Sequence, residues 1–460
     1  MKRISLLIIF LVSTVCLRAQ TVETLDATFE NARAEFDAIR QEFADSADAA
    51  LADYLALEAK LFEEYEQFRK EVMQTWGDTV MVESTRKEWV EYSEDRTSRT
   101  SVDWEYGKVD IEVLVDPSDD DATVRSKLET AVAELLVSRG NTNVFNSSVL
   151  PDAPVSDRPL LEGQIDLSAY GVTSYPAPEA PKPFANRGAA PAPTRGTTLD
   201  LSRNKTTAAV KPATTTMADR MAEQEKVVEQ KKQEEQKKGE MQKVMAEVPA
   251  IVVASQTPAV QTVNTAEGTK KVVTITMQLV EDHIPKRAEK FKEIVKKHSL
   301  AYAVDAPLIY AIMEQESSFN PVAQSWVPAY GLMQLVPKSG GRDAYRFVHK
   351  TDGIPSADFL FDPDNNIQLG TGYLKLLMST TFKKIEDDRC RMLCAIAAYN
   401  TGAGNVSRAI NGTTNISKAI PTINTMTYDQ LFEHLKKSLP HAETQDYIQK
   451  VTSKMEKYIK

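Results

Sequence analysis

The chain has 460 residues, more than one hydrophobic core usually accommodates, so we expect two or three domains. Apolar residues make up 42% of the sequence and charged residues 26%, a composition typical of soluble proteins. The formal net charge of -10 argues against a nucleic-acid-binding protein, because such proteins usually carry a basic face.

The first 19 residues are organised like an export signal. Lys2 and Arg3 supply a positive start, and residues 4–17 are mostly apolar. This apolar run is shorter than the roughly 20 residues that span a bilayer. We therefore predict a signal peptide at 1–19, cleaved before Gln20, and an exported, periplasmic protein.

Attachment to a membrane is a separate question. The alternative to cleavage is that the same N-terminal segment stays in place as an anchor. Lipid attachment at Cys16 is disfavoured, because residues 13–15 lack the small residues expected just before a lipidated cysteine. Association with the outer membrane is therefore left open by the sequence.

Residues 20–138 are predicted to form an α+β domain. Residues 102–115 alternate between apolar and polar types around Gly107, which predicts a β-hairpin, and 122–138 predict a helix over the sheet. Earlier apolar residues recur at spacings of four and three, as along one face of a long acidic helix: Leu25, Phe29, Ala32, Phe36, Ile39, Phe43, Tyr54, Leu57, Leu61, Tyr65, Phe68 and Val72. This face is expected to form the core of the domain; the alternatives are a helical hairpin that packs on itself and a surface for a partner protein.

The middle of the chain has the composition of a connector. Residues 139–217 are rich in Pro, Ala, Ser and Thr, which predicts a solvated linker. Residues 218–247 are dominated by Lys, Glu and Gln, which predicts an exposed helix or a charged spacer. Residues 248–284 are expected to hold more linker and a strand that pairs with the 102–115 hairpin, because an isolated strand needs a partner. The remaining domain, 285–460, is predicted to be all-helical.

One carboxyl group in the helical domain is placed for acid chemistry. Glu316 falls on the helix face that it shares with Ile309, Ile312 and Met313, whereas Glu314 points about 200° away and is expected to be solvated. A carboxyl in apolar surroundings keeps its proton to higher pH, as a general acid for a glycosidic oxygen requires. The alternative for this pattern alone is a structural glutamate paired with Lys or Arg.

Further motifs follow in a fixed order. They are Glu316-Ser317-Ser318-Phe319-Asn320-Pro321, Ala323-Gln324-Ser325, Gly331-Leu332-Met333-Gln334-Leu335 and Ala398-Tyr399-Asn400-Thr401-Gly402-Ala403-Gly404, and then Pro440, Glu443, Thr444 and Tyr447. This set resembles the soluble-lytic-transglycosylase (SLT) catalytic domain, a helical lysozyme-like fold, from about 288 to 447. Residues 89–95 and 280–287 resemble the membrane-bound lytic murein transglycosylase C family, which joins an N-terminal domain to that catalytic domain.

The resemblance implies an enzyme that cleaves peptidoglycan between N-acetylmuramic acid and N-acetylglucosamine without water, leaving 1,6-anhydro ends. Glu316 would be the sole catalytic acid/base, hydrogen-bonded by Tyr399, and no cofactor is implied. The residues implied to bind substrate are Ser325, Met333, Gln334, Tyr399, Asn400 and Tyr447. Glycan strands are the expected partner, and binding of other cell-wall enzymes to the N-terminal helices is left open.

Two other functions remain as alternatives. A hydrolytic muramidase would usually need a second carboxylate, for which Asp343 and Asp362 are available. A catalytically silent cell-wall-binding protein is disfavoured by the intact Glu316, Gln334 and Tyr399.

The sequence does not favour a metal site. The segment that starts at Asp362 opens like a calcium loop, but it has Ile367 where Gly is needed and Tyr373 where Glu is needed. Cys390 and Cys394 have no histidine at zinc-type spacing, and a pair four residues apart on a helix rarely meets disulfide geometry. We interpret both cysteines as small helix residues.

Overall fold

The computed structural model describes residues 51–77, 81–140, 159–170, 235, 238–254, 258–325 and 329–459. The predicted signal peptide, Cys16, residues 20–50 of the predicted helical face and much of the predicted linker lie outside these ranges. Glu58–Lys460 belong to one compact unit. Within the described ranges no helix is both long enough and apolar enough to cross a membrane.

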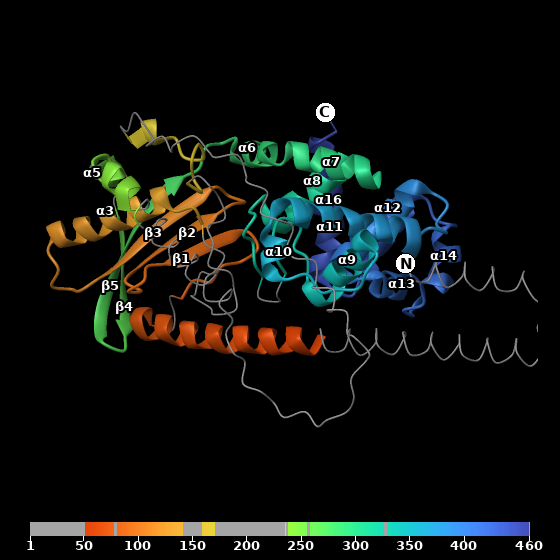
Figure 1. The fold of residues 1–460 in the computed structure, drawn as a ribbon, viewed down its shortest axis with the longest axis horizontal. Helices are drawn as coiled ribbons and strands as arrows, with labels where there is room; N and C mark the ends of the chain where they lie inside the picture. Colours follow the sequence, from red (N-terminus) through yellow and green to blue (C-terminus); the bar gives the residue numbers. More distant parts are fainter. Residues whose placement is uncertain are drawn as a thin grey trace, which may run out of the picture. The chain divides into compact units, whose positions relative to one another are not determined.

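The N-terminal domain is built on a five-stranded antiparallel sheet with the order β1-β2-β3-β5-β4 (Figure 1). Its strands are β1 (Glu88–Tyr92), β2 (Ser98–Asp103), β3 (Lys108–Val115), β4 (Ala259–Thr265) and β5 (Gly268–Gln278). The predicted hairpin corresponds to β2 and β3, which turn at Gly107 with φ +69°.

The strand near residue 275 pairs with the hairpin, although a long segment of chain separates them. In the register of β3 and β5, Val109 lies opposite Met277 and Ile111 opposite Ile275. All four side chains are buried, so the register aligns the apolar faces of the two strands. Strand β4 was not predicted, because most of the residues of β4 are exposed and the strand has no apolar alternation.

Helices cover both faces of this sheet. Helix α3 (Asp121–Val137) begins at Asp120, whose carboxylate accepts a hydrogen bond from Thr123 N, and it packs on β2 and β3. The helix over residues 51–76 lies on the other face (Figure 1), where its apolar residues Phe68, Val72 and Trp76 join a separate core. The prediction that this helical face is core is therefore confirmed for Phe68 and Val72.

Parts of two segments that were predicted to be solvated are packed in the ranges that the structure describes. Within the predicted linker, Leu161 is fully buried, Ile165 forms a β-bridge with Leu279, and the segment ends in the short helix η1 (Leu167–Tyr170). Within the predicted spacer, Val244 is buried, just before α5 (Val248–Ala254), which packs on α3. Composition did not predict this packing, because only a few apolar residues, such as Leu161, Ile165 and Val244, are buried in these parts.

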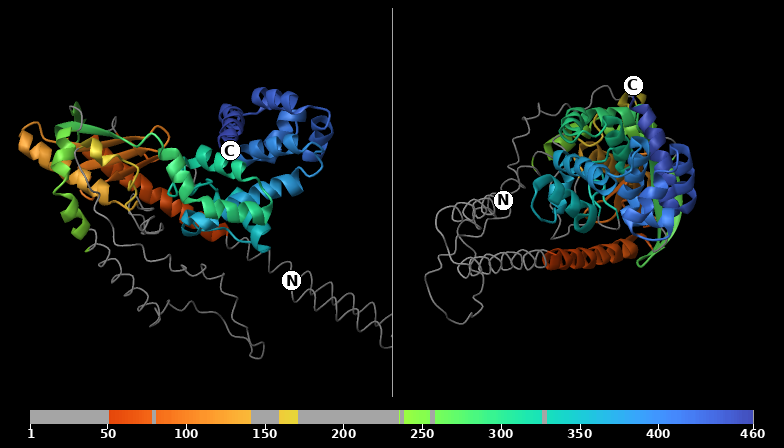
Figure 2. Two further views of the ribbon diagram at one scale, coloured as in Figure 1. Left: turned by 90° about the horizontal axis from the view of Figure 1, so that it is seen from above. Right: turned by 90° about the vertical axis from the view of Figure 1, so that its right-hand side faces the viewer.

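The C-terminal domain is all-helical in the ranges that the structure describes, as predicted, so the fold is α+β overall (Figures 1 and 2). Its helices are α6 (His283–Lys290), α7 (Lys292–Tyr302), α8 (Ala306–Ser317), α9 (Arg342–His349), α10 (Ala357–Phe361), α11 (Pro363–Leu376), α12 (Asp388–Thr401), α13 (Ala403–Asn411), α14 (Ile416–Ile423), α15 (Tyr428–Ser438) and α16 (Ala442–Lys457). Two short π-helical turns, η2 (Pro337–Gly341) and η3 (Leu377–Thr381), lie between them. Helix α8 packs against α7 and α16, and α12 also packs against α16.

Cys390 and Cys394 lie on α12 as buried, free thiols. Burial raises the pKa of Cys390 to about 11, and it raises that of Cys394 further. Both are therefore unreactive core residues at neutral pH, as the sequence analysis predicted.

Candidate active site

Glu316 lies in the last turn of α8, and only 4% of its surface is exposed. The helix ends directly after it, because Ser318 and Phe319 both adopt left-handed conformations, with φ of +48° and +62°. Such conformations are uncommon for residues other than glycine. The chain therefore turns sharply away from α8 and leaves the Glu316 carboxyl at the helix end.

Both oxygens of the Glu316 carboxyl accept a hydrogen bond. The hydroxyl of Tyr447, on α16, donates to Oε1 at 2.6 Å. Nη1 of Arg86, in the segment that precedes β1, donates to Oε2 at 3.3 Å, and Nη2 of the same residue donates to Glu443 Oε1 at 2.7 Å. Residues from two distant parts of the sequence thus surround the Glu316 carboxyl.

These surroundings have opposing effects on protonation. Burial raises the pKa of Glu316, whereas the charge of Arg86 and the hydrogen bond from Tyr447 lower it, and the net effect is a raised pKa. Burial and the neighbouring Glu316 hold the pKa of Tyr447 well above its usual value, so its hydroxyl stays protonated. Glu316 can therefore hold a proton at higher pH than an ordinary glutamate, which is the property of a general acid.

The loop of residues 331–335 lies beside the end of α8. Gly331 has φ +76°, and a Cβ atom there would lie 2.3 Å from Leu360 O, so only glycine fits without movement. The buried Asn366 side chain donates to Tyr330 O at 2.8 Å and accepts from Met333 N at 2.8 Å. Ser317, next to Glu316, donates through its hydroxyl to Leu332 O at 2.8 Å. The loop is thus fixed to α8 and to α11.

Two predicted substrate-binding residues lie in this loop. Met333 is fully buried and belongs to the core, and its backbone N donates to Asn366 Oδ1; a contact of Met333 with substrate stays a prediction. Gln334 has a left-handed backbone with φ +46°, and its Nε2 donates to Ala323 O and Gly331 O. Its buried Oε1 has no hydrogen-bond partner among the described residues. An unpaired acceptor of this kind is costly to bury, which suits a group that meets a ligand.

Tyr399 makes a different contact from the one expected. Its hydroxyl donates to Met333 O at 2.8 Å, and the residue that donates to Glu316 is Tyr447. The expected hydrogen bond between Tyr399 and Glu316 is therefore wrong for this structure, although the two groups are close enough for Glu316 to contribute to the raised pKa of Tyr399, after burial. Tyr399 instead fixes the 331–335 loop.

The remaining predicted residues lie around this centre. The Asn400 side-chain oxygen accepts a hydrogen bond from Thr444 Oγ1 at 2.6 Å, which ties α12 to α16. Ser325 N donates to Ala329 O at 3.2 Å. A role of Ser325 and Asn400 in substrate binding stays a prediction.

The prediction that Glu314 is solvated is wrong. Only 4% of its surface is exposed, and its carboxylate pairs with Lys454 at 3.1 Å and accepts hydrogen bonds from Lys457 and Tyr458. Burial acts to raise the pKa of Glu314, but the Tyr458 hydrogen bond and the lysines outweigh it and lower that pKa. Because α16 packs on α8, the side of α8 away from Glu316 is covered as well.

Sequence reasoning missed Arg86 and Asn366. Arg86 stands in a segment without apolar periodicity, 230 positions before Glu316, so nothing local connects the two. Asn366 lies in the segment that opens like a calcium loop; it follows the helix-starting pair Asp362-Pro363 and so lies in the first turn of α11. Asp362 caps that helix and Asp343 pairs with Arg346, so neither carboxylate contacts Glu316.

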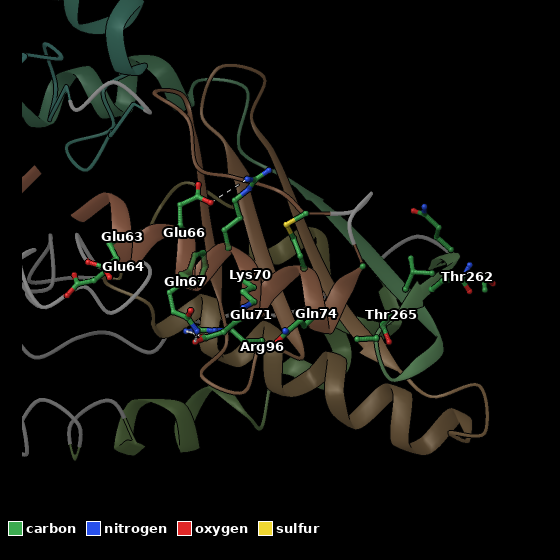
Figure 3. Close-up of a pocket in the computed structure, with 18 of the residues that line it drawn as sticks. Glu63, Glu64, Glu66, Gln67, Lys70, Glu71, Gln74, Arg96, Thr262 and Thr265 are labelled. Carbon is green, nitrogen blue, oxygen red and sulfur yellow. Dashed lines mark hydrogen bonds and ion pairs between the residues drawn. The ribbon is translucent and has the colours of Figure 1, made fainter. Parts of the chain in front are cut away.

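The N-terminal domain holds a groove of about 1520 Å³ between the helix over residues 51–76 and strand β4. Figure 3 shows charged side chains of that helix along it, among them Glu63, Glu66, Lys70 and Glu71. Some of the charged side chains that line the groove form ion pairs with one another, for example Arg96 with Glu71 at 4.0 Å. The Glu66 and Glu71 side chains in this groove are 42% and 47% exposed, whereas Glu316 is buried, so the Glu316 site is the better candidate for catalysis.

Two segments of the chain match known protein families. Residues 293–420 match the transglycosylase SLT domain, and residues 55–172 match the membrane-bound lytic murein transglycosylase C, N-terminal domain. Membrane-bound lytic murein transglycosylase C of Sodalis glossinidius (strain morsitans) is 43% identical over 191 residues, which are 42% of this chain and 53% of that protein. The protein of the same name from Yersinia pestis (strain Pestoides F) is 42% identical over 184 residues, 40% of this chain and 51% of that protein. The chain spans about half the length of the curated relatives it matches.

The similarity of the chain to solved structures is weaker. An inactive mutant of lytic transglycosylase Slt from Pseudomonas aeruginosa is 29% identical, over 36% of this chain and 23% of that chain, with a TM-score of 0.28. The 70 kDa soluble lytic transglycosylase of Escherichia coli is 24% identical, over 38% of this chain and 25% of that chain, with a TM-score of 0.29. On the sequence matches, the N-terminal part of the chain is similar to the N-terminal domain of membrane-bound lytic murein transglycosylase C, and the C-terminal part is similar to the transglycosylase SLT domain.

Proposed function

We propose that this chain is a lytic transglycosylase that cleaves the β-1,4 bond between N-acetylmuramic acid and N-acetylglucosamine in peptidoglycan. The observation that carries the proposal is the buried carboxyl of Glu316, whose pKa is raised, unlike that of the buried Glu314, and which lies within the SLT match. The relatives are named lytic murein transglycosylases, which supports the same substrate class.

The first chemical step uses Glu316 as an acid. Its proton passes to the oxygen that links the two sugars, and the bond from that oxygen to C1 of the muramic acid breaks. The positive charge that develops at C1 is stabilised by the N-acetyl group of the same sugar. Tyr447 then holds the resulting carboxylate of Glu316 by donating to Oε1, and Arg86 compensates its charge at Oε2.

The second step uses the same carboxylate as a base. It takes the proton of the C6 hydroxyl as the C6 oxygen bonds to C1, which closes the 1,6-anhydro ring and restores protonated Glu316. The C6 hydroxyl is already part of the bound sugar, whereas water would have to be recruited. No water is consumed, so the reaction is that of a lyase.

The alternative enzyme, a hydrolytic muramidase, usually requires a second carboxylate that activates water. Asp343 and Asp362 were the candidates from the sequence, and both are engaged away from Glu316. Glu443 lies nearer, but its Oε1 accepts a hydrogen bond from Arg86 at 2.7 Å. The structure therefore favours one-carboxylate chemistry.

The proposal is tested by digesting purified peptidoglycan with the wild-type chain and with Glu316→Gln, followed by liquid chromatography and mass spectrometry. The wild type is expected to release muropeptides with 1,6-anhydro ends, about 18 mass units lighter than hydrolysed products because no water is added. Glu316→Gln is expected to lose activity while keeping its fold, since the amide can neither give nor take the proton. Glu433→Gln, an exposed residue of α15, is the matched control and should stay active.

Other results lead to other functions. Release of reducing-end products alone from the earliest times would replace the lyase by a muramidase. Binding of peptidoglycan without any cleavage by the wild type would indicate a silent cell-wall-binding protein. Wild-type rates for Glu316→Gln would remove Glu316 from the mechanism.

We also infer export to the periplasm, in contact with the glycan strands. The predicted signal peptide supports export, and the relatives are named membrane-bound, which supports a location in the cell envelope. Outer-membrane association and binding of other cell-wall enzymes to the N-terminal helices stay predictions. Fractionation of cells that produce the chain, with detection in periplasmic and outer-membrane fractions, tests the location.

A further inference from the structure

We propose that Arg86, which the N-terminal domain supplies, is a positioning residue of the active site. Its guanidinium holds the Glu316 carboxyl in place and sets how readily this group gives up and regains its proton. This inference rests on the proposed function, because it assigns Arg86 a role in the acid and base steps of Glu316. It also gives the N-terminal domain a part in the chemistry of the helical domain.

The segment that carries Arg86 is held by the sheet on both sides. Thr85 N donates to Glu88 O at 2.8 Å, at the start of β1. Trp104 N, just after β2, donates to Lys87 O at 2.8 Å. The backbone on either side of Arg86 is therefore fixed, and the direction of its side chain depends on the fold of the N-terminal domain.

A second arginine connects the same part of the sheet to the end of α8. Nη2 of the buried Arg287 donates to Trp104 O at 2.6 Å, and its Nε donates to Ser318 O at 2.9 Å. Trp104 is the residue that also holds Lys87, and Ser318 follows Glu316 by two positions. A continuous set of hydrogen bonds thus links the backbone beside Arg86 to the backbone beside Glu316, which fixes the distance between the two side chains.

The charges around Glu316 give Arg86 a defined effect. In the part of the chain that the structure describes, four groups face the Glu316 carboxyl. They are Arg86 from the N-terminal domain, Glu443 and Tyr447 from α16, and Tyr399 from α12. Arg86 is the one cation among the described residues that bonds to Glu316, at 3.3 Å. Burial and Glu443 oppose ionisation of Glu316, and Arg86 favours it. The arginine therefore keeps a deeply buried carboxyl able to return to the ionised form that the second step needs.

Glu443 opposes the effect of Arg86 on the ionisation of Glu316. Its side chain is 62% exposed, and it shares the guanidinium with Glu316. Because it is negatively charged, it weakens the effect of Arg86 and favours the protonated form of Glu316. Removing Arg86 and removing Glu443 should therefore change the ionisation of Glu316 in opposite directions.

The test compares full-length wild type with Arg86→Met, which keeps much of the aliphatic stem, and with Arg86→Lys, which keeps the charge. Initial rates of anhydro-muropeptide release are measured against pH on purified peptidoglycan. In Arg86→Met the alkaline limb of the profile is expected to move up by about one pH unit or more, the size typical of a carboxyl that loses a neighbouring arginine. Arg86→Lys is expected to restore most of the wild-type profile.

A second measurement does not depend on activity. Glu316 is titrated by carbon NMR in chains labelled with 13C-glutamate, and its signal is identified by its absence in Glu316→Gln. The pH at the midpoint of the Glu316 titration is expected to rise in Arg86→Met and to fall in Glu443→Gln. Arg125→Met, an exposed arginine of α3 in the same domain, is the control and should leave the midpoint unchanged.

The outcomes separate the two proposals. If the midpoint and the profile of Arg86→Met equal those of the wild type, the role of Arg86 is refuted and the proposed function stands. If the wild type releases no muropeptides but the midpoint still rises, the proposed function fails and the link between Arg86 and Glu316 holds. If Arg86→Met does not fold, Glu443→Gln decides, and an unchanged or raised midpoint in that variant overturns the inference.

Discussion

Gly331→Ala is expected to destabilise the helical domain far more than the same change at Gly412. Both glycines have φ +76°, so both variants carry the strain of a left-handed alanine, about 1–2 kcal/mol, offset by about 0.4–1 kcal/mol because alanine restricts the unfolded chain. They differ in their surroundings. An added Cβ at Gly331 would lie 2.3 Å from Leu360 O and 2.4 Å from Asn366 Nδ2, whereas nothing lies within 4 Å at Gly412.

The difference between the two variants isolates the steric cost. Overpacking against backbone costs about 1–3 kcal/mol, and a weakened Asn366 hydrogen bond adds about 1 kcal/mol. Gly331→Ala should therefore lose roughly 2–4 kcal/mol more than Gly412→Ala. At about 2–4 °C per kcal/mol for a domain of 150–250 residues, this corresponds to a Tm lower by roughly 4–16 °C.

Thermal unfolding followed by circular dichroism measures this difference directly. Activity should fall as well in Gly331→Ala, because Asn366 fixes the loop that carries Met333 and Gln334. Equal Tm values for the two variants would refute the reasoning, since they would mean that the loop moves aside freely. In that case the loop could not be a fixed part of the active site.

Two further changes probe groups on α8 and α16. Tyr447→Phe removes the hydroxyl that donates to Glu316 Oε1, so the pKa of Glu316 should rise. The alkaline limb of the pH–rate profile should therefore move to higher pH. An unchanged profile would contradict the 2.6 Å hydrogen bond. Glu314→Gln breaks a buried ion pair and should cost about 3–5 kcal/mol in the free energy of unfolding, measured by urea titration. Because the folded-state pKa of Glu314 is lowered, its contribution is present above the unfolded pKa and is lost as pH falls through the folded pKa, so wild type and variant should converge in acid.

The parts of the fold that could be predicted from the sequence are those with a local apolar period. The alternation in β3 and β5 located both strands, and the requirement that a strand be paired identified their association. The helical period placed Glu316 on a buried face of α8. Strand β4 could not be found this way, because its side chains are mostly exposed.

The errors in the site share one physical cause, which is contact between segments far apart in sequence. The helical period placed Glu314 away from Glu316 and therefore in solvent, but this argument holds only for a helix with one covered face. Helix α8 is covered on both sides, and Lys454 of α16 compensates the Glu314 charge. Likewise Arg86 reaches Glu316 from another domain, and no pattern within either segment records that contact.

The packing of α16 on α8 has a consequence for the design of mutants. Near one end of α16, Tyr447 binds Glu316; near its other end, Lys454 and Lys457 bind Glu314. A change at Glu314 therefore weakens the same helix contact that positions the hydroxyl of Tyr447. From the sequence alone, Glu314→Gln would serve as a neutral control for Glu316→Gln. The structure argues against this choice, because Glu314→Gln could lose activity through displacement of α16. An exposed glutamate such as Glu433 avoids this coupling, and for that reason it is the control against which the role of Glu316 is decided.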